Sequence, residues 1–246
     1  MVNRQTLVEH CAELLEVRSF EDYCPNGLQI QGKDEIAKIV SGVSANQALI
    51  DQAIDLGADA ILVHHGFFWK NEELTITGIK KNRIKALLDH NINLLAYHLP
   101  LDAHPTLGNN AQLGQRLGLT DATPVAGSLL WQASTQMSLT ELTQSIWQLS
   151  DREPQVFGHS PTPINKIAWC TGAAQSAIGE AIALGADVYI SGEVSESTPA
   201  TALENNLSFI AAGHHATERY GVQALGAHLA QTFDIDHQFV DIDNIV

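Results

Sequence analysis

The chain has 246 residues, 45% of them hydrophobic, which is enough to bury one large core or two smaller ones. Its net charge is −15, with no basic cluster beyond a modest run at residues 80–85, so duplex nucleic acid is not an expected partner. The absence of any apolar stretch near 20 residues and the three widely spaced cysteines predict a cytoplasmic protein without a membrane partner or a disulfide framework.

The first third of the chain alternates helical and strand patterns. Residues 1–17 have the spacing of an amphipathic helix with interior charges, unlike a signal peptide. Pro25-Asn26-Gly27 predicts a turn before the next strand. A second helix is expected to end at Gly57, a residue typical of helix C-caps. The elements expected here are strands at Leu28–Gln31, Ile39–Val43 and Ala60–Val63, and helices at 1–17 and Asn46–Leu56.

The rest of the chain continues the alternation of strands and helices. Residues 128–160 depart from the regular pattern, and His159–Pro163 is expected to be a proline-containing linker. Continuous apolar runs such as Ala60–Val63 are typical of parallel strands buried on both faces. The further elements expected are helices at Lys81–Asp89, Asn110–Leu117, Leu139–Leu149, Thr198–Glu204 and Thr217–Ala230, and strands at Asn91–Ala96, Gln132–Ser138 and Asn206–Ala211.

Two segments of the chain repeat each other at a constant offset of 128 residues. Residues 38–59 match residues 166–187 without a gap, and eleven of the twenty-two positions are identical. This similarity indicates an internal duplication. Each copy has a strand-helix-strand pattern, and a weaker match between residues 91–96 and 206–211 extends it. We therefore expect an α/β fold of two similar, interlinked domains, at about 1–125 and 126–246, each three-layered α/β/α with a mainly parallel sheet.

Three clusters of histidine and carboxylate residues follow predicted strands. Imidazole and carboxylate are ligands for Zn, Mn or Fe, so these clusters predict a metal centre. Since open parallel sheets bind ligands at the carboxyl ends of their strands, a site that uses all three clusters must lie between the two halves. The clusters are Val63-His64-His65-Gly66, His98-Leu99-Pro100-Leu101-Asp102-Ala103-His104 and Gly213-His214-His215-Ala216-Thr217-Glu218.

Spacing within the clusters favours two ions. His214 and Glu218, four residues apart, would share one face if a helix begins there, and His215 with Glu218 would also fit. His64 and His65 are adjacent, which suits two neighbouring ions better than one. Two-metal sites usually also hold a bridging carboxylate, with the ions roughly 3.5–4 Å apart.

Several other residues have a simpler explanation as structural residues. His104 and His159, taken alone, are more often hydrogen-bonded structural residues than ligands. Glu193, the repeat counterpart of His65, is as easily a capping or solvated carboxylate as a site residue. The Phe67–Trp69 run could stack a base, but core or interface packing is the stronger interpretation. Gly108-Asn109-Asn110 is expected to be a turn and N-cap, and no glycine-rich phosphate loop is present.

Six motifs together resemble a known family over essentially the whole chain. The chain is similar to the GTP cyclohydrolase I type 2 homologues, also called Ngg-interacting-factor-three-like proteins, and is closest to their short bacterial members. The motifs that carry the resemblance are residues 23–29 (YCPNGLQ), 63–66 (VHHG), 98–102 (HLPLD), 108–111 (GNNA), 191–196 (SGEVSE) and 213–219 (GHHATER).

The resemblance implies an assembly and a set of ligands. Members have two similar, interlinked α/β domains, assemble into a toroidal homohexamer and carry a dinuclear metal centre in the interdomain cleft. Carried onto this chain, the implied ligands are His64, His65, Asp102, His214 and Glu218, with Glu218 as the bridge. The family's name points by analogy to cyclohydrolase chemistry, and repair or clearance of damaged nucleotides is a second role that the resemblance implies.

We therefore predict a metal-dependent, hydrolase-like protein with two divalent ions (Zn, Fe or Mn) and a small-molecule, nucleotide-like substrate. The ions would lower the pKa of a bound water toward neutrality, so that it attacks an electrophilic carbon or phosphorus. His98, four residues before Asp102, is the candidate proton shuttle, unless it merely orients a ligand. The alternatives are a non-catalytic metal-binding scaffold ring and a factor that processes nucleic acid or damaged nucleotides.

Overall fold

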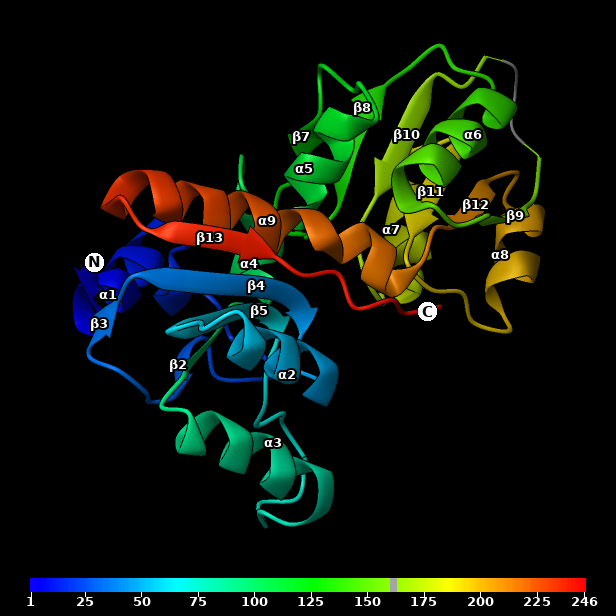
Figure 1. Ribbon diagram of the computed structural model, residues 1–246. Helices are drawn as coiled ribbons and strands as arrows, with labels where there is room; N and C mark the ends of the chain where they lie inside the picture. The colour runs from blue at the N-terminus through cyan, green and yellow to red at the C-terminus, as the bar shows by residue number, and fades with distance from the viewer. Residues whose placement is uncertain (160–162) are drawn as a thin grey trace. The chain divides into compact units, whose positions relative to one another are not determined.

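The computed structural model describes residues 1–159 and 163–246, which form two compact units, each with its own sheet (Figure 1). The first unit comprises Met1–His104 and Gly221–Asp243, and the second comprises Pro105–Tyr220 and Asn244–Val246. The chain thus leaves the first unit and later returns to it. The division expected near residue 125 follows the sequence repeat and stays a prediction. The linker expected at His159–Pro163 lies mostly outside the described residues.

The first unit is built on a five-stranded sheet in the order β13-β4-β5-β6-β2. The first four of these strands are parallel to their neighbours, and β2 is an antiparallel edge strand. β2 begins at Gly27, the last residue of the expected turn, which has φ +112°, so the strand starts and ends one residue earlier than expected. The strands are β2 (Gly27–Ile30), β4 (Lys38–Ser44), β5 (Ala60–His65), β6 (Asn93–Ala96) and β13 (Asp236–Phe239), and a small separate ladder pairs β1 (Val2–Asn3) with β3 (Glu35–Ile36).

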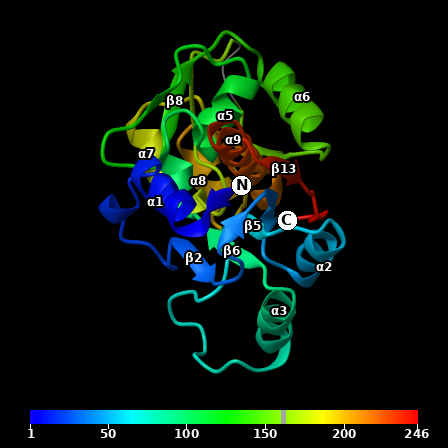
Figure 2. The same ribbon diagram turned by 60° about the vertical axis from the view of Figure 1, so that its left-hand side comes forward.

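Helices cover both faces of this sheet. Alternate strand residues, including Val40, Ile61 and Leu94, pack against α2 (Gln47–Asp55) and α3 (Gly78–Asp89). α2 is capped by Asn46, whose side chain accepts a hydrogen bond from the Leu49 amide, as helix N-caps do. On the other side lie α1 (Arg4–Leu14), beside β2 (Figure 2), and the second half of α9 (His214–Phe233), which packs on β13. In the central strands β4, β5 and β6, nearly all residues are buried whichever side they point to, as expected for a sheet between two helix layers.

The second unit has a six-stranded sheet in the order β7-β8-β10-β11-β12-β9. Its three central strands, β10 to β12, are parallel; β8 and β9 pair antiparallel with β10 and β12, and β7 pairs antiparallel with β8. The strand expected at residues 132–138 ends at Ser134, because Ser138 instead caps the following helix through a capping box with Glu141. The strands are β7 (Thr123–Pro124), β8 (Trp131–Ser134), β9 (Gln155–Phe157), β10 (Lys166–Trp169), β11 (Val188–Ser191) and β12 (Ser208–Ala211).

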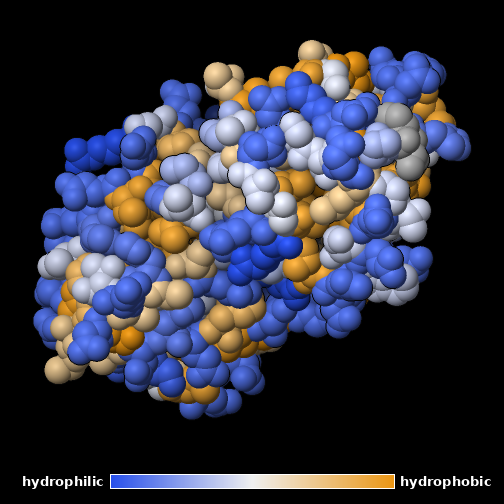
Figure 3. Space-filling model, turned by 90° about the horizontal axis from the view of Figure 1, so that it is seen from above, coloured by the Kyte–Doolittle hydropathy of each residue, from blue (hydrophilic) through white to orange (hydrophobic). Residues whose placement is uncertain are grey.

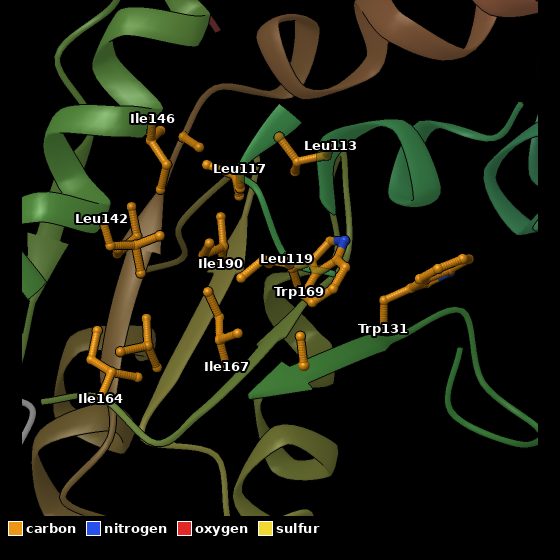
Figure 4. Packing of buried hydrophobic residues seen from close by; sticks show 14 of the residues in the cluster. Leu113, Leu117, Leu119, Trp131, Leu142, Ile146, Ile164, Ile167, Trp169 and Ile190 are labelled. Carbon is orange, nitrogen blue, oxygen red and sulfur yellow. The ribbon is translucent and has the colours of Figure 1, made fainter. Parts of the chain in front are cut away.

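Two apolar clusters cover the two faces of the second sheet. On one face, α5 (Asn109–Arg116), α6 (Leu139–Ser150) and Tyr220 of α9 pack on residues such as Ile167 and Ile190 (Figure 4). On the other face, α7 (Ile178–Ala183) and α8 (Thr198–Glu204) pack on Tyr189 and Phe209. The predicted fold class is confirmed: two similar, interlinked α/β units, each with a sheet between helix layers.

The hydrogen bonds of the two strand-helix-strand modules, β4-α2-β5 and β10-α7-β11, also show the duplication. Asp59 accepts bonds from the backbone amides of residues 37 and 38, and Asp187 accepts the equivalent bonds from residues 165 and 166. The strand registers also correspond, since Ile39 faces Ala60 in one unit and Ile167 faces Val188 in the other. The modules differ between the strands, where residues 175–177 form a 3-10 turn before the shorter α7.

The face of the molecule seen in Figure 3 is largely polar. Hydrophilic residues cover most of the face in Figure 3, with hydrophobic side chains in separate smaller areas. Among the described residues, no helix combines the length and the apolar character that crossing a membrane would require. Cys11, Cys24 and Cys170 are buried and form no disulfide within the described part of the chain.

Candidate metal centre

In the first unit, two imidazoles lie at the carboxyl end of a central parallel strand. His64 and His65 are the last residues of β5, which runs two residues further than expected, and their ring centroids lie 4.7 Å apart. His64 is fully buried, and its Nδ1 donates to the carbonyl of Tyr97 at 2.9 Å. The Nδ1 of His65 lies 3.0 Å from Ser44 Oγ. Each ring is thus held through Nδ1, and Nε2 is the second nitrogen that it offers.

Asp102 stands next to His64 in the same unit. It lies on the short helix α4 (Leu99–Ala103), and it is only 6% exposed. The fixed φ of Pro100 favours the first turn of this helix. The Oδ2 of Asp102 is 3.5 Å from His64 Nε2. A buried carboxylate facing an imidazole nitrogen is an arrangement in which a cation can be held by both.

His98 joins this group from the end of the loop that follows β6. One ring nitrogen each of His64, His65 and His98 lies within 4.8 Å of the others, so these three residues could hold a metal ion. The Nδ1 of His98 donates to Asp22 at 2.7 Å. Burial by itself would raise the pKa of Asp22, but hydrogen bonds from His98, Asn26 and the Tyr23 amide outweigh it and lower the pKa to about 2. Our sequence analysis missed Asp22, which has no cluster around it in the sequence.

In the second unit, α9 begins at His214 and places Glu218 one turn later, as expected from their spacing. His214 Nε2 and Glu218 Oε2 are 3.0 Å apart, and Glu218 is 3% exposed. Glu193, whose role the sequence left open, accepts a 2.7 Å hydrogen bond from His214 Nδ1. Burial alone would lower the pKa of His214, but Glu218 and Glu193 outweigh it and raise the pKa to about 9. The pair therefore favours a positive charge, which a metal cation could also supply.

Two glycines make room for this pair. Gly172 has φ +70°, and a Cβ atom there would overlap Oε1 of Glu218. A Cβ atom on Gly192 would overlap the carbonyl of Gly172 and the backbone of His214. Thr217 Oγ1 accepts a hydrogen bond from the Gly172 amide and so ties this loop to α9. The backbone is packed directly against Glu218 and His214, and neither glycine has space for a side chain.

The other candidates are structural in character. Phe67 is buried in the core of the first unit, with Phe68 packed against it, so the aromatic run is largely core. Trp69 instead lies edge-on to His98, with ring centroids 5.0 Å apart. Within the described part of the chain, His104 and His159 belong to no group of three donors close enough to share an ion. Gly108 is the N-cap of α5, as expected.

Comparison with known proteins places the chain in a family. The family model Duf34/NIF3 (NGG1p interacting factor 3) matches residues 2–245. The chain belongs to the Duf34/NIF3 family. Relatives in Pseudomonas aeruginosa and Escherichia coli K12, both named GTP cyclohydrolase 1 type 2 homolog, are 49% identical, over 97% of this chain and 97% of the first protein, and over 94% of this chain and 95% of the second. The predicted family is thus confirmed.

Solved structures of similar proteins share the fold. A protein described as "protein ybgI, unknown function" is 46% identical and has a TM-score of 0.96 over the full length of both chains. TTHA1606 from Thermus thermophilus is 31% identical, with a TM-score of 0.90, also over both full chains. The family assignment and the donor groups agree that this chain could bind metal. The convergence of ligands from both units, and the role of each, are proposals.

Proposed function

We propose that the protein binds two divalent metal ions through His64, His65, Asp102, His214 and Glu218, and hydrolyses a nucleotide-like small molecule. In this proposal, neither unit holds the ions alone: the first supplies the histidine pair and Asp102, and the second supplies His214 and Glu218. We also propose a cytoplasmic location, with which three cysteines that form no disulfide are consistent.

One observation carries the proposal: each of the three histidine ligands holds an oxygen partner at Nδ1. The partners are the Tyr97 carbonyl for His64, Ser44 for His65 and Glu193 for His214. Metal-binding histidines in proteins almost always have their second ring nitrogen fixed in this way, which sets the tautomer and orients the ring. Structural histidines have no need to share one pattern in two separate units, so metal binding explains the recurrence best.

Each of the proposed site residues would have a separate role in the reaction. Divalent ions would supply Lewis acidity and lower the pKa of water toward neutrality. Asp102 and Glu218 would balance the charge of the ions, and Glu218 is proposed as the bridging carboxylate. His98, beside His64 and His65, would move a proton during the reaction. The names of the relatives, which include GTP cyclohydrolase, support a nucleotide-like substrate.

Metal analysis tests the site. Elemental analysis of the purified protein should find two ions per chain, and Glu218→Ala should lower the occupancy of both, because the bridge is lost. Glu204→Ala, an exposed glutamate on α8, is the matched control and should keep both ions. Full loading of the Glu218→Ala protein would refute the bridging role.

A nucleotide-hydrolysis screen on the metal-loaded protein tests the activity. His98→Gln should reduce turnover by about 10²–10⁴-fold, the usual contribution of a general acid–base, while the ions stay bound. His90→Gln, an exposed histidine at the end of α3, should leave turnover unchanged. A metal-loaded protein that hydrolyses none of the nucleotides would favour the scaffold alternative. Salt-dependent DNA binding would favour nucleic-acid processing.

A further inference from the structure

Asp22 lies in the loop before β2 and has an unusually complete set of hydrogen bonds for a loop carboxylate. Its side chain is 3% exposed. Oδ1 accepts from the Tyr23 amide at 2.5 Å and from His98 Nδ1 at 2.7 Å. Oδ2 accepts from Asn26 Nδ2 at 2.8 Å and from the Leu99 amide at 2.9 Å. Both oxygens are therefore surrounded by donors, and the carboxylate is fixed in position.

This geometry sets the proton position on His98. An ionised carboxylate can only accept, so the bond to Asp22 requires a proton on His98 Nδ1. In the neutral ring, Nε2 then keeps its lone pair. The backbone amide of His98 also donates to Asn26 Oδ1 at 2.7 Å, so the same loop holds the main chain and the ring. The His64 and His65 rings lie 5.0 and 5.8 Å from the His98 ring between centroids.

We propose that Asp22 is a positioning residue that holds His98 in the Nδ1–H tautomer, so that Nε2 presents a lone pair to the His64–His65 pair. The use of this lone pair as a proton acceptor rests on the proposed function. The tautomer does not, because it follows from the contacts of Asp22 alone. Without Asp22, the His98 ring has no fixed acceptor at Nδ1 and loses its defined orientation.

Asp22→Asn separates this role from a merely structural one. The amide group must turn its NH₂ toward one of the two positions that the carboxylate oxygens occupied. Turned toward Oδ2, it would face two donors, Asn26 Nδ2 and the Leu99 amide. Turned toward Oδ1, it faces the Tyr23 amide and His98, and a histidine nitrogen can change from donor to acceptor. The second orientation loses fewer bonds, and it forces the His98 proton onto Nε2.

The experiment is ¹H–¹⁵N NMR of the full chain, with histidine rings labelled and metal removed by a chelator. His98→Gln assigns the His98 signals. The wild-type protein should show His98 protonated at Nδ1, and Asp22→Asn should move the proton to Nε2. Cys24→Ala is the matched control, because the Cys24, Asp22 and His98 donor atoms lie within 4.8 Å of one another. That variant should keep the Nδ1–H tautomer.

The wild-type spectrum alone can overturn the proposal, even if a variant does not fold. A wild-type His98 protonated at Nε2 would contradict it directly. An unchanged tautomer in folded Asp22→Asn, or the same change in Cys24→Ala, would show that Asp22 does not set the proton position. Because the readout needs neither metal nor turnover, a protein that hydrolyses nothing would refute the proposed function and leave this result standing.

Discussion

At the scale of single residues, Gly172 is a position at which both the backbone conformation and the lack of space require glycine. Its φ is +70°, and an added Cβ would overlap Glu218. Gly172→Ala should therefore have two effects: a loss of about 1–2 kcal/mol in unfolding free energy from the left-handed backbone, and a displaced Glu218 with fewer bound ions. Urea unfolding and elemental analysis measure the two effects separately.

Gly185→Ala is the control for this prediction. Gly185 also has φ +70°, but its missing Cβ would point into open space. The variant should lose the same backbone free energy and keep its metal. Equal metal content in the two variants would show that Gly172 provides only backbone conformation.

Asp59 gives a pH-dependent prediction away from the metal site. Burial alone would raise its pKa, but hydrogen bonds from Lys33 and from the amides of residues 37 and 38 outweigh it and lower the pKa below the usual value. Its contribution to stability is therefore present above the unfolded-state pKa near 3.9 and is lost as pH falls through the lower folded-state value. Asp59→Asn should destabilise the protein at pH 7 and reduce the loss of stability on acidification.

Urea unfolding at pH 7 and near pH 3 measures this difference. Asp51→Asn, at an exposed position on α2, is the control and should follow the wild type at both pH values. If Asp59→Asn lost as much stability on acidification as the wild type, the low pKa of Asp59 would not contribute to folding.

At the scale of elements, the duplication predicts equal effects at equivalent positions. Lys38 donates to the Leu56 carbonyl at the end of α2, and Lys166 donates to the Leu184 carbonyl at the end of α7. Lys38→Met and Lys166→Met should each cost about 0.5–1.5 kcal/mol, the net value of a typical hydrogen bond. Thermal unfolding of the two variants tests this, and a cost at only one site would mean that the modules have diverged in energetics.

Element prediction from the sequence succeeded where the pattern is local. The apolar run at residues 60–63 and the Gly57 C-cap signal lie within about ten residues, and β5 and α2 formed there. β13 was missed, because Asp236–Phe239 alternates exposed and half-buried residues and pairs with β4, some 200 residues earlier. An edge strand of this kind is specified by its partner more than by its own residues.

The candidate site residues, too, were predicted only where they lie close together in the sequence. His64 and His65, and the pair His214 and Glu218, were recognised because each lies within a short segment at the end of a strand or the start of a helix. Asp22 stands 76 residues before His98. A contact of that separation leaves no periodic signal, so the sequence alone could not assign Asp22 a role. The hydrogen bond between Glu193 and His214 was missed for the same reason.

At the scale of the whole molecule, bound metal should stabilise the native state. A ligand at 100 times its dissociation constant adds about 2.7 kcal/mol, which corresponds to roughly 5–10 °C in Tm for a chain of this size. Chelator treatment should lower the Tm of the wild type by that amount, and Glu218→Ala should respond much less. Scanning calorimetry with and without chelator measures this, and an identical shift in both proteins would contradict the proposed site.

The second prediction at this scale is assembly into a homohexameric ring, proposed from the family resemblance. Light scattering at micromolar concentration should report about six times the chain mass of 26.6 kDa. A mass of one chain would contradict the ring.

The return of residues 221–243 to the first unit also has a consequence for biosynthesis. While the ribosome is still making the second unit, β4 is an uncovered sheet edge, because β13 has not yet been translated. Unpaired edges of this kind pair readily with other chains. The sheet of the nascent first unit is therefore closed only after Asp236–Phe239 has been translated. During that interval, it is the part of the protein most exposed to aggregation and most in need of a chaperone.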